Sequence, residues 1–364
     1  LQKNSYFLFG PRGTGKSFLI NGTFPHVLLF NLLDDEVYEA LMRRPKLIEE
    51  SLGKNTLVII DEIQKLPKLL DEVHRLIEAR AVTFLLTGSS ARKLKRGGAN
   101  LLAGRAWEAQ LFSLSYSELP DFELNKYLNY GGLPRVWKSI DPEEELHNYV
   151  NNYLKEEVKA EAMVRSYERF VYFLDAMAIN NARELHYQNI ASECGVPVRT
   201  LEGYIEVLKD TLIGHELLPF RKTKKRTAYA KSKFYFFDIG VANSIAKRFP
   251  LRPAHTEFGE AFETFIINEV RTYLSYTRKK LELSFWRTKV CEVALLIGNK
   301  IAIEIKAVQK IKDEFFDGLQ YLQEEGIFKQ YILVTRAKTE GTRKGISFVY
   351  YENFLNSLWA GEYV

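Results

Sequence analysis

The first 120 residues alternate short apolar runs with helical patterns. The apolar runs are Tyr6–Phe9, Val27–Phe30, Leu57–Ile60, Val82–Leu86 and Trp107–Phe112. Each run has the length of a strand and is apolar at consecutive positions, which is typical of strands covered on both faces. Strands that alternate with helices predict a parallel sheet. We therefore expect an α/β domain in this part of the chain.

The pattern changes in the rest of the chain. From about 125 to 212 it is helical, with no convincing strand. A helix is then expected near 256–274, where apolar positions recur with a period of 3.6. The elements expected after that helix are strands at 283–286, 292–297 and 301–305, a helix near 313–324, and strands at 331–335 and 347–351. This order predicts a second α/β domain.

A glycine-rich segment directly follows the first apolar run. It reads Gly-Pro-Arg-Gly-Thr-Gly-Lys-Ser and matches the pattern G-x-x-x-x-G-K-[ST] between a strand and a helix. Its backbone N–H groups can turn toward phosphate oxygens, and the helix N-terminus adds partial positive charge. Lys16 is expected to reach the β- and γ-phosphates of ATP, and the Ser17 hydroxyl to bind Mg²⁺. The residues expected to bind the nucleotide are Gly10, Pro11, Arg12, Gly13, Thr14, Gly15, Lys16, Ser17 and Phe18.

Two carboxylates end the third apolar run. Asp61 and Glu62 directly follow Leu57–Ile60, and the carboxyl ends of strands are where open α/β sheets bind ligands. We expect Asp61 to hold Mg²⁺, directly or through water, and Glu62 to polarise the attacking water. A solvated acidic turn is the alternative interpretation.

Two further residues are candidates for the same site. Ser89 follows the fourth apolar run within Thr-Gly-Ser-Ser and could position the γ-phosphate or the water, although ordinary turn chemistry would use the same residues. Arg105 could reach the γ-phosphate of a neighbouring subunit, which would imply a homo-oligomer formed through this domain. A surface arginine without that role is the alternative.

These motifs resemble those of the prokaryotic AAA-type ATPases of the archaeal-ATPase group, distant relatives of the STAND NTPases. The segments Val-Ile-Ile-Asp-Glu-Ile-Gln, Leu-Thr-Gly-Ser-Ser, Leu-Ala-Gly-Arg and Tyr-Gly-Gly-Leu-Pro-Arg (130–135) carry the resemblance together with the phosphate loop. It implies a sheet with the third and fourth strands beside the phosphate-loop strand. It also implies an ATPase core at 1–124, a helical lid at 125–178, a winged helix at 179–237 and a nuclease-like domain at 238–364.

A helix–turn–helix and a basic segment suggest contact with DNA. Residues 185–210 fit two helices with Gly195 at the turn, although Glu202 and Glu206 on the second helix are poor for reading bases. Segment 221–233, here called the basic segment, has seven basic residues and no acidic one, so it could clamp phosphates as a wing or form a solvated loop. The residues expected to contact DNA are Arg199, Arg221, Lys222, Lys224, Lys225 and Arg226. A second basic cluster is Arg92, Lys93, Lys95 and Arg96.

The C-terminal part resembles a PD-(D/E)xK nuclease fold. Glu304 and Lys306 lie on one face of a strand, and Glu263 lies on a helix beside buried surface. Such sites need two or three carboxylates around Mg²⁺ and a lysine. The family commonly has Glu-Val-Asp where this chain has Glu292-Val-Ala294. We expect Glu263 and Glu304 to be metal ligands at an impaired site, unless Glu292 compensates.

Composition adds a few limits. The net charge of +5 over 364 residues is too small to identify a partner. The apolar runs are far shorter than the roughly 18 residues that a membrane span needs, and the two cysteines lie far apart, so we expect a cytoplasmic protein. We predict Mg²⁺-dependent ATP binding and hydrolysis coupled to DNA engagement. The alternatives are an ATP-controlled switch that binds protein partners and an active ATP-dependent DNA nuclease.

Overall fold

A computed structural model describes residues 4–89, 92, 94, 102–154, 166–223, 225 and 231–364. The chain forms two compact units. The first comprises Leu1–Phe112 and Val207–Ile213, and the second comprises Ser113–Glu206 and Gly214–Val364. Within the ranges described, no helix is long and apolar enough to cross a membrane.

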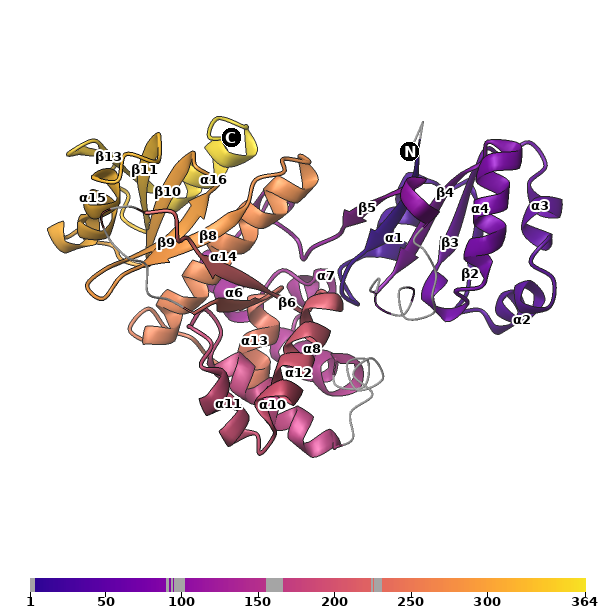
Figure 1. The fold of residues 1–364 in the computed structure, drawn as a ribbon, viewed down its shortest axis with the longest axis horizontal. Helices are drawn as coiled ribbons and strands as arrows, with labels where there is room; N and C mark the ends of the chain where they lie inside the picture. Colours follow the sequence, from indigo (N-terminus) through magenta and orange to yellow (C-terminus); the bar gives the residue numbers. More distant parts are fainter. Residues whose placement is uncertain are drawn as a thin grey trace. The chain divides into compact units, whose positions relative to one another are not determined.

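The first unit is built on a five-stranded parallel sheet (Figure 1). In spatial order its strands are β2 (Leu28–Asn31), β3 (Leu57–Asp61), β4 (Thr83–Gly88), β1 (Ser5–Phe9) and β5 (Ala106–Gln110). The five apolar runs of the sequence therefore form the five strands. The prediction of a parallel α/β domain is confirmed.

Helices cover both faces of this sheet. Ile59 packs with Ile20 in one core, whereas Val58 and Ile60 belong to the opposite core. Neighbouring residues of one strand thus enter different cores, which explains why the strands are apolar at consecutive positions. The helices of this unit are α1 (Lys16–Thr23), α2 (Asp35–Arg43), α3 (Leu47–Ser51), α4 (Leu69–Arg80) and the short 3₁₀ turns η1 (Ile63–Lys65) and η2 (Leu102–Gly104).

The strand order corrects one implication of the family resemblance. β4 pairs with β1 in register from Tyr6↔Leu85 to Phe9↔Gly88, as expected. β3, however, lies one strand further out, between β2 and β4, and β5 takes the other side of β1. Crossover helices allow this because they separate chain order from spatial order. The carboxyl ends of β1, β4 and β3 therefore lie side by side, in that order, along one edge of the sheet.

The second unit begins with helices. They are η3 (Tyr116–Glu118), α6 (Leu124–Tyr130), α7 (Pro134–Lys138), α8 (Pro142–Asn148), the π-helical η4 (Tyr149–Leu154), α10 (Tyr167–Ile179), α11 (Tyr187–Glu193), α12 (Val198–Asp210) and α13 (Ile239–Ala246). The last residues of α12, from Val207 on, belong to the first unit. The turn between α11 and α12 contains Gly195 at φ 62°, in the left-handed region that favours glycine. The predicted helical middle of the chain is confirmed.

A mixed eight-stranded sheet forms the rest of this unit. In spatial order its strands are β12 (Gly341–Arg343), β13 (Ile346–Tyr350), β11 (Gln330–Thr335), β10 (Ile301–Lys306), β9 (Glu292–Ile297), β8 (Leu283–Arg287), β6 (Gly214–Pro219) and β7 (Lys233–Phe236). The accompanying helices are α14 (Thr256–Tyr276), η5 (Asp313–Phe316), α15 (Asp317–Gln323) and α16 (Tyr351–Trp359). The predicted order of helix, three strands, helix and strand is present, with β12 as an additional short strand.

The sequence suggested a hairpin wing after the second helix of the helix–turn–helix, but not that the hairpin would join the C-terminal sheet. β6 and β7 form an antiparallel hairpin that follows α12, and β6 also pairs in parallel with β8 through Leu218↔Ser284 and Pro219↔Phe285. The hairpin thus extends the C-terminal sheet. Through β6, the chain that directly follows α12 is hydrogen-bonded to the strands of the C-terminal sheet.

The two glycines of Tyr-Gly-Gly-Leu-Pro-Arg lie against the buried carboxylate of Asp238. Asp238 accepts hydrogen bonds from the N–H of Gly132 at 2.9 Å and of Val241 at 3.2 Å, the latter as N-cap of α13. Gly131 has φ 71°, and a Cβ there would lie 1.9 Å from Asp238 Oδ1. The two glycines are therefore needed to bring the backbone against this carboxylate, a structural role.

Replacing Asp238 should be costly. Asp238→Ala removes a helix cap worth about 1 kcal/mol and leaves buried N–H groups unpaired at about 1–3 kcal/mol. We expect a loss of about 2–4 kcal/mol in the free energy of unfolding, measured by urea denaturation. The control is Asp141→Ala, because Asp141 caps α8 through Glu144 N at 3.1 Å but is exposed. Equal losses in the two variants would contradict a special role for the buried carboxylate.

Candidate nucleotide site and C-terminal polar cluster

The glycine-rich loop has the backbone that a phosphate cradle requires. Gly13 and Gly15 have φ 83° and 97°, conformations that are strained for other residues. A Cβ at Gly10 would lie 2.5 Å from the carbonyl oxygen of Leu111. Gly15 directly precedes α1 and has no side chain to cap it. The first N–H groups of the helix, which have no acceptor inside the helix, are thereby suited to bind an anion.

Lys16 lies inside this loop. Only 7% of the residue is exposed, and its Nζ donates to the carbonyl oxygens of Gly10 at 2.7 Å and Pro11 at 3.2 Å. A phosphate oxygen is a charged acceptor and forms a stronger hydrogen bond with an ammonium group than a carbonyl does. The Nζ of Lys16 thus lies beside the first residues of the loop. A phosphate oxygen could replace the two carbonyl oxygens as its hydrogen-bond acceptor.

Asp61 links the loop to two strands. Ser17 Oγ donates to Asp61 Oδ2 at 3.1 Å, and Thr87 Oγ1 donates to Asp61 Oδ1. Asp61 ends β3 and is 5% exposed, while Thr87 belongs to the neighbouring β4. A hydroxyl and a carboxylate at this separation are the hard oxygen ligands that Mg²⁺ prefers. Ser17 and Asp61 therefore fit the predicted metal.

Glu62 has an unusual backbone conformation. Its φ of 60° and ψ of 43° lie in the left-handed region, which costs a non-glycine residue roughly 1–3 kcal/mol. Its N–H donates to Thr87 Oγ1 at 3.2 Å, and its Oε2 accepts from Gln64 Nε2. Contacts at both ends thus hold the carboxylate that was predicted to polarise water.

Gln64 was missed by the sequence reasoning. It is 8% exposed, and its Nε2 contacts Glu62 and lies 3.5 Å from Ser89 Oγ. A Cβ at Gly88 would lie 2.4 Å from Gln64 Oε1, so the glycine of Thr-Gly-Ser makes room for this amide. Its only sequence signal is its position two residues after Glu62, because the 3₁₀ turn η1 folds it back onto that side chain.

The remaining predicted nucleotide-site residues lie further out. Arg12 is exposed, and Phe18 is 81% exposed. Arg105 pairs with Glu78 of α4, with Nε and Nη2 at 2.8 and 2.5 Å from Glu78 Oε1. Both side chains are more than a third exposed, so solvent screens this ion pair and Arg105 could leave it for another partner. A role for Arg105 at a neighbour's nucleotide stays a prediction.

A buried lysine occupies the centre of the C-terminal polar cluster. Lys233 Nζ contacts Glu263 Oε1 at 3.0 Å and also Glu292 Oε1. Tyr235 donates to the same oxygen of Glu263 at 2.7 Å. Burial lowers the pKa of Lys233, but the carboxylates of Glu263 and Glu292 raise it by more, so its net pKa lies above the ordinary value. The ammonium is a fixed charge between the two glutamates.

The predicted E-x-K pair meets beside this cluster. Lys306 Nζ lies 2.7 Å from Glu304 Oε1, and the N–H of Ala294 donates to Glu304 Oε2 at 3.1 Å. Burial raises the pKa of Glu304 to about 7 against the lowering effect of Lys306. Over the described part of the chain, no group of three or more His, Cys, Asp or Glu residues is arranged to hold a metal ion. The roles of Glu263 and Glu304 as metal ligands stay predictions.

The predicted DNA-contacting residues are only partly described. Arg199 on α12 is exposed, as are Arg221, Lys222 and Lys225 in the segment between β6 and β7. Lys224 and Arg226 lie outside the described residues, as do Lys93, Lys95 and Arg96 of the second basic cluster.

Comparison with protein families assigns a class to the N-terminal part. Residues 2–120 match a family model described as an AAA domain. Residues 121–252 and 258–354 match two models described as domains of unknown function, DUF8612 and DUF4143. With the parallel sheet and the phosphate loop, the first match shows that the chain carries an AAA-type P-loop ATPase domain at its N-terminal end.

Individual relatives extend over more than this domain. "Uncharacterized protein MJ1544" of Methanocaldococcus jannaschii is 25% identical over an alignment of 267 residues, and the match covers 64% of this chain and 60% of that protein. The chain thus spans about three fifths of the length of this relative. A solved STAND protein with a tetratricopeptide repeat sensor, PH0952 from Pyrococcus horikoshii, is 16% identical, with a TM-score of 0.23 over 76% of this chain and 46% of that one.

The contacts of Gln64 predict a positioning role. Gln64→Ala should leave nucleotide binding intact but release the Glu62 carboxylate, so that kcat for ATP falls about tenfold while KM stays unchanged. Steady-state kinetics with a fluorescent nucleotide titration separates the two effects. Gln64→Asn, which is one methylene shorter, should not restore kcat. A raised KM at normal kcat would assign Gln64 to binding, and a raised kcat would show that it restrains Glu62.

Proposed function

We propose that this protein binds Mg²⁺–ATP in the glycine-rich loop and hydrolyses it. The observation that carries the proposal is the chain of contacts from Ser17 to Asp61, Thr87 and Glu62. It joins the loop after β1 to the carboxyl ends of β3 and β4. The residues for phosphate, metal and water are thereby assembled at one edge of the sheet, next to the loop.

Each residue has a distinct task in this proposal. The loop N–H groups and Lys16 bind and orient the phosphates. Ser17 and Asp61 would hold Mg²⁺, whose charge offsets the negative charge on phosphate oxygens. Glu62 orients the attacking water and takes up its proton at a carboxylate oxygen. Thr87 and Gln64 keep Asp61 and Glu62 in place through the contacts described above.

We also propose that the second unit engages DNA through the basic segment. Its described residues Arg221, Lys222 and Lys225 are exposed, and the segment joins β6 to β7 directly after the helix pair α11–α12. This is the chain order of a winged helix, in which the wing contacts phosphates. The acidic residues Glu202 and Glu206 make α12 poor for base readout, so the contact is assigned to the basic segment.

We propose that the C-terminal cluster binds without cutting. Lys233 contacts both Glu263 and Glu292, Arg287 adds a second cation beside Glu292, and Glu304 is engaged by Lys306 and the N–H of Ala294. Position 294, where the nuclease family commonly has Asp, supplies no carboxylate. Phosphodiester cleavage needs a metal held where charge develops, whereas attraction of phosphate needs only fixed cations.

The ATPase proposal predicts two different defects. Lys16→Ala should weaken ATP binding because it removes a charge from the phosphates. Glu62→Gln should bind ATP normally but turn over at least about 100-fold more slowly, because the general base is lost. Phosphate release and fluorescent nucleotide binding, each with and without single-stranded and duplex DNA, measure both. Turnover of Glu62→Gln at the rate of the unmodified protein would refute the role of Glu62.

The DNA proposal predicts a change in salt dependence. Neutralising Lys222, Lys224, Lys225 and Arg226 to Ala should weaken duplex binding and flatten the plot of log affinity against log salt. Each lost phosphate contact removes about 0.9 from the slope. Fluorescence anisotropy over a range of salt concentrations measures it.

A charge-matched control separates contact from overall charge. Lys300, Lys312, Lys329 and Lys338 are exposed lysines elsewhere in the second unit, and their replacement by Ala changes the net charge equally. We expect a nearly unchanged slope in this variant. Equal slopes in the two variants would mean that the basic segment is a solvated loop.

A further inference from the structure

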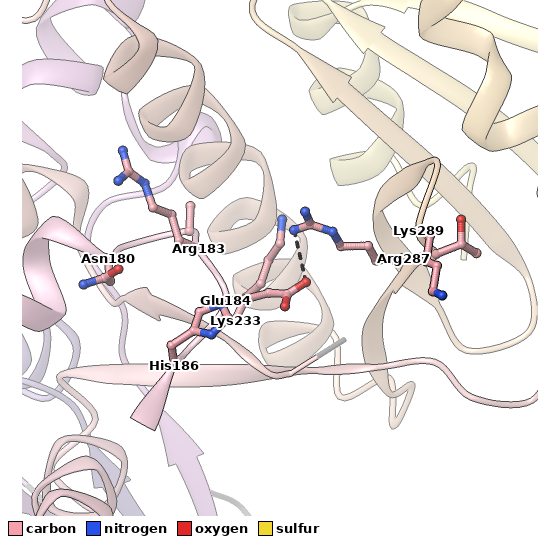
Figure 2. Close-up of a pocket in the computed structure, with 9 residues that line it drawn as sticks. Asn180, Arg183, Glu184, His186, Lys233, Arg287 and Lys289 are labelled. Carbon is pink, nitrogen blue, oxygen red and sulfur yellow. Dashed lines mark ion pairs between the residues drawn. The ribbon is translucent and has the colours of Figure 1, made fainter. Parts of the chain in front are cut away.

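A cavity of about 600 Å³ in the second unit has four Arg and Lys side chains among its nine lining residues (Figure 2). It lies where the segment between α10 and α11, the start of β7 and the turn between β8 and β9 come together. Its lining includes the positive side chains of Arg183, Lys233, Arg287 and Lys289 and one carboxylate, that of Glu184. A volume of this size accommodates a nucleotide-sized group.

Lys233 forms the fixed part of this lining. It is 4% exposed, and its Nζ is held by Glu263 and Glu292 over the ring of Phe285, 5.3 Å from the ring centroid. An ammonium with this many partners keeps its position and its charge. It stands between two carboxylates, which is where a divalent cation would have to lie to be bound by both.

The turn between β8 and β9 presents further positive charge. Arg287 reaches across the cavity, with its Nη1 3.0 Å from Glu184 Oε1 (Figure 2). The same Nη1 lies 3.4 Å from Glu292 Oε2. Thr288 shapes the turn, because its N–H donates to Cys291 O at 2.8 Å and its Oγ1 accepts from Cys291 N at 3.2 Å. Exposed Lys289 is thus carried on a hydrogen-bonded turn at the cavity.

The basic segment leads directly into this cavity. Its last two basic residues are Lys231 and Lys233. Lys231 Nζ lies 3.3 Å from Nδ1 of His186, another lining residue, and Lys233 is itself part of the lining. The described end of the basic segment therefore lies at the cavity, and cations that follow one another along the chain suit a polyanion. This continuity favours a nucleic-acid strand over a small free anion.

We propose that this cavity binds a phosphate group of a nucleic-acid strand, with Lys233 in place of a metal ion. The proposal rests on the proposed engagement of DNA and identifies a second contact point for it. Lys233 supplies a positive charge at the position where a metal would lie, and Arg287, Lys289 and Arg183 line the same cavity. An ammonium has no open coordination position to activate water, so the bound strand stays intact.

The test uses the double variant Arg183→Gln and Lys289→Gln in the full chain. Both side chains are exposed, and Glu260, the partner of Arg183 at 2.6 Å, keeps its contact with Arg248 at 3.4 Å. The probe is a fluorescently labelled single-stranded oligonucleotide, and its affinity is measured by anisotropy over a range of salt concentrations. We expect about a tenfold loss of affinity and a slope reduced by about 0.7 for each lost contact.

Two controls accompany this variant. Arg135→Gln with Lys300→Gln makes the same charge change at exposed positions of the same unit and should bind normally. Binding by the unmodified chain should be equal in EDTA and in Mg²⁺, because Lys233 replaces the metal. Denaturing gels of the Mg²⁺ samples should show an intact oligonucleotide. Loss of affinity in EDTA, or cleavage in Mg²⁺, would overturn the proposal.

The outcomes also separate this inference from the proposed function. If the basic-segment variant binds DNA weakly while Arg183→Gln with Lys289→Gln binds normally, DNA engagement stands and the cavity has no part in it. If neither variant loses affinity, both proposals fail. If the double variant loses affinity for inorganic phosphate or a mononucleotide but not for the oligonucleotide, the cavity serves a free phosphate compound and the strand assignment is wrong.

Discussion

The candidate nucleotide site depends on the hydrogen bonds that the Asp61 carboxylate accepts. It accepts hydrogen bonds from Ser17, which follows β1, and from Thr87, which belongs to β4. These contacts are available because β1, β4 and β3 are neighbours in that order. Thr87 also accepts the N–H of Glu62. The Thr87 side chain therefore connects Asp61, the proposed metal ligand, to Glu62, the proposed water-activating residue, and the strand order brings both beside the phosphate loop.

The second unit also buries carboxylates, but it pairs them with lysine side chains. Three glutamates, Glu263, Glu292 and Glu304, face Lys233 and Lys306 in a largely buried setting. Isolated charges could not be buried at this depth without large cost. Each carboxylate contacts an ammonium group of the protein, and Arg287 adds a further positive charge beside Glu292, so cations of the chain itself offset the buried negative charge.

The sequence was sufficient where local pattern determines structure. Consecutive apolar runs predicted all five strands of the first sheet, and the glycine spacing predicted the phosphate loop, because these features arise within short segments. Spatial order was not accessible in the same way, since crossover connections separate it from chain order, and β3 was placed too close to β1. Gln64 and Lys233 were missed as site residues for a related reason. Each gains its role from side chains that chain folding brings to it, and no spacing rule marks them in advance.

The pairing of β6 with β8 has a consequence for how the molecule can be divided. The region matched by DUF8612 ends at residue 252, and the region matched by DUF4143 begins at residue 258, which suggests a convenient place to cut. Yet β6 lies before that gap and β8 after it, and they are hydrogen-bonded neighbours in one sheet. A fragment that ends in the gap would expose the edge of β6, and one that begins there would expose the edge of β8. Unpaired strand edges recruit other chains, so each half would be prone to self-association for reasons unrelated to its biological partners.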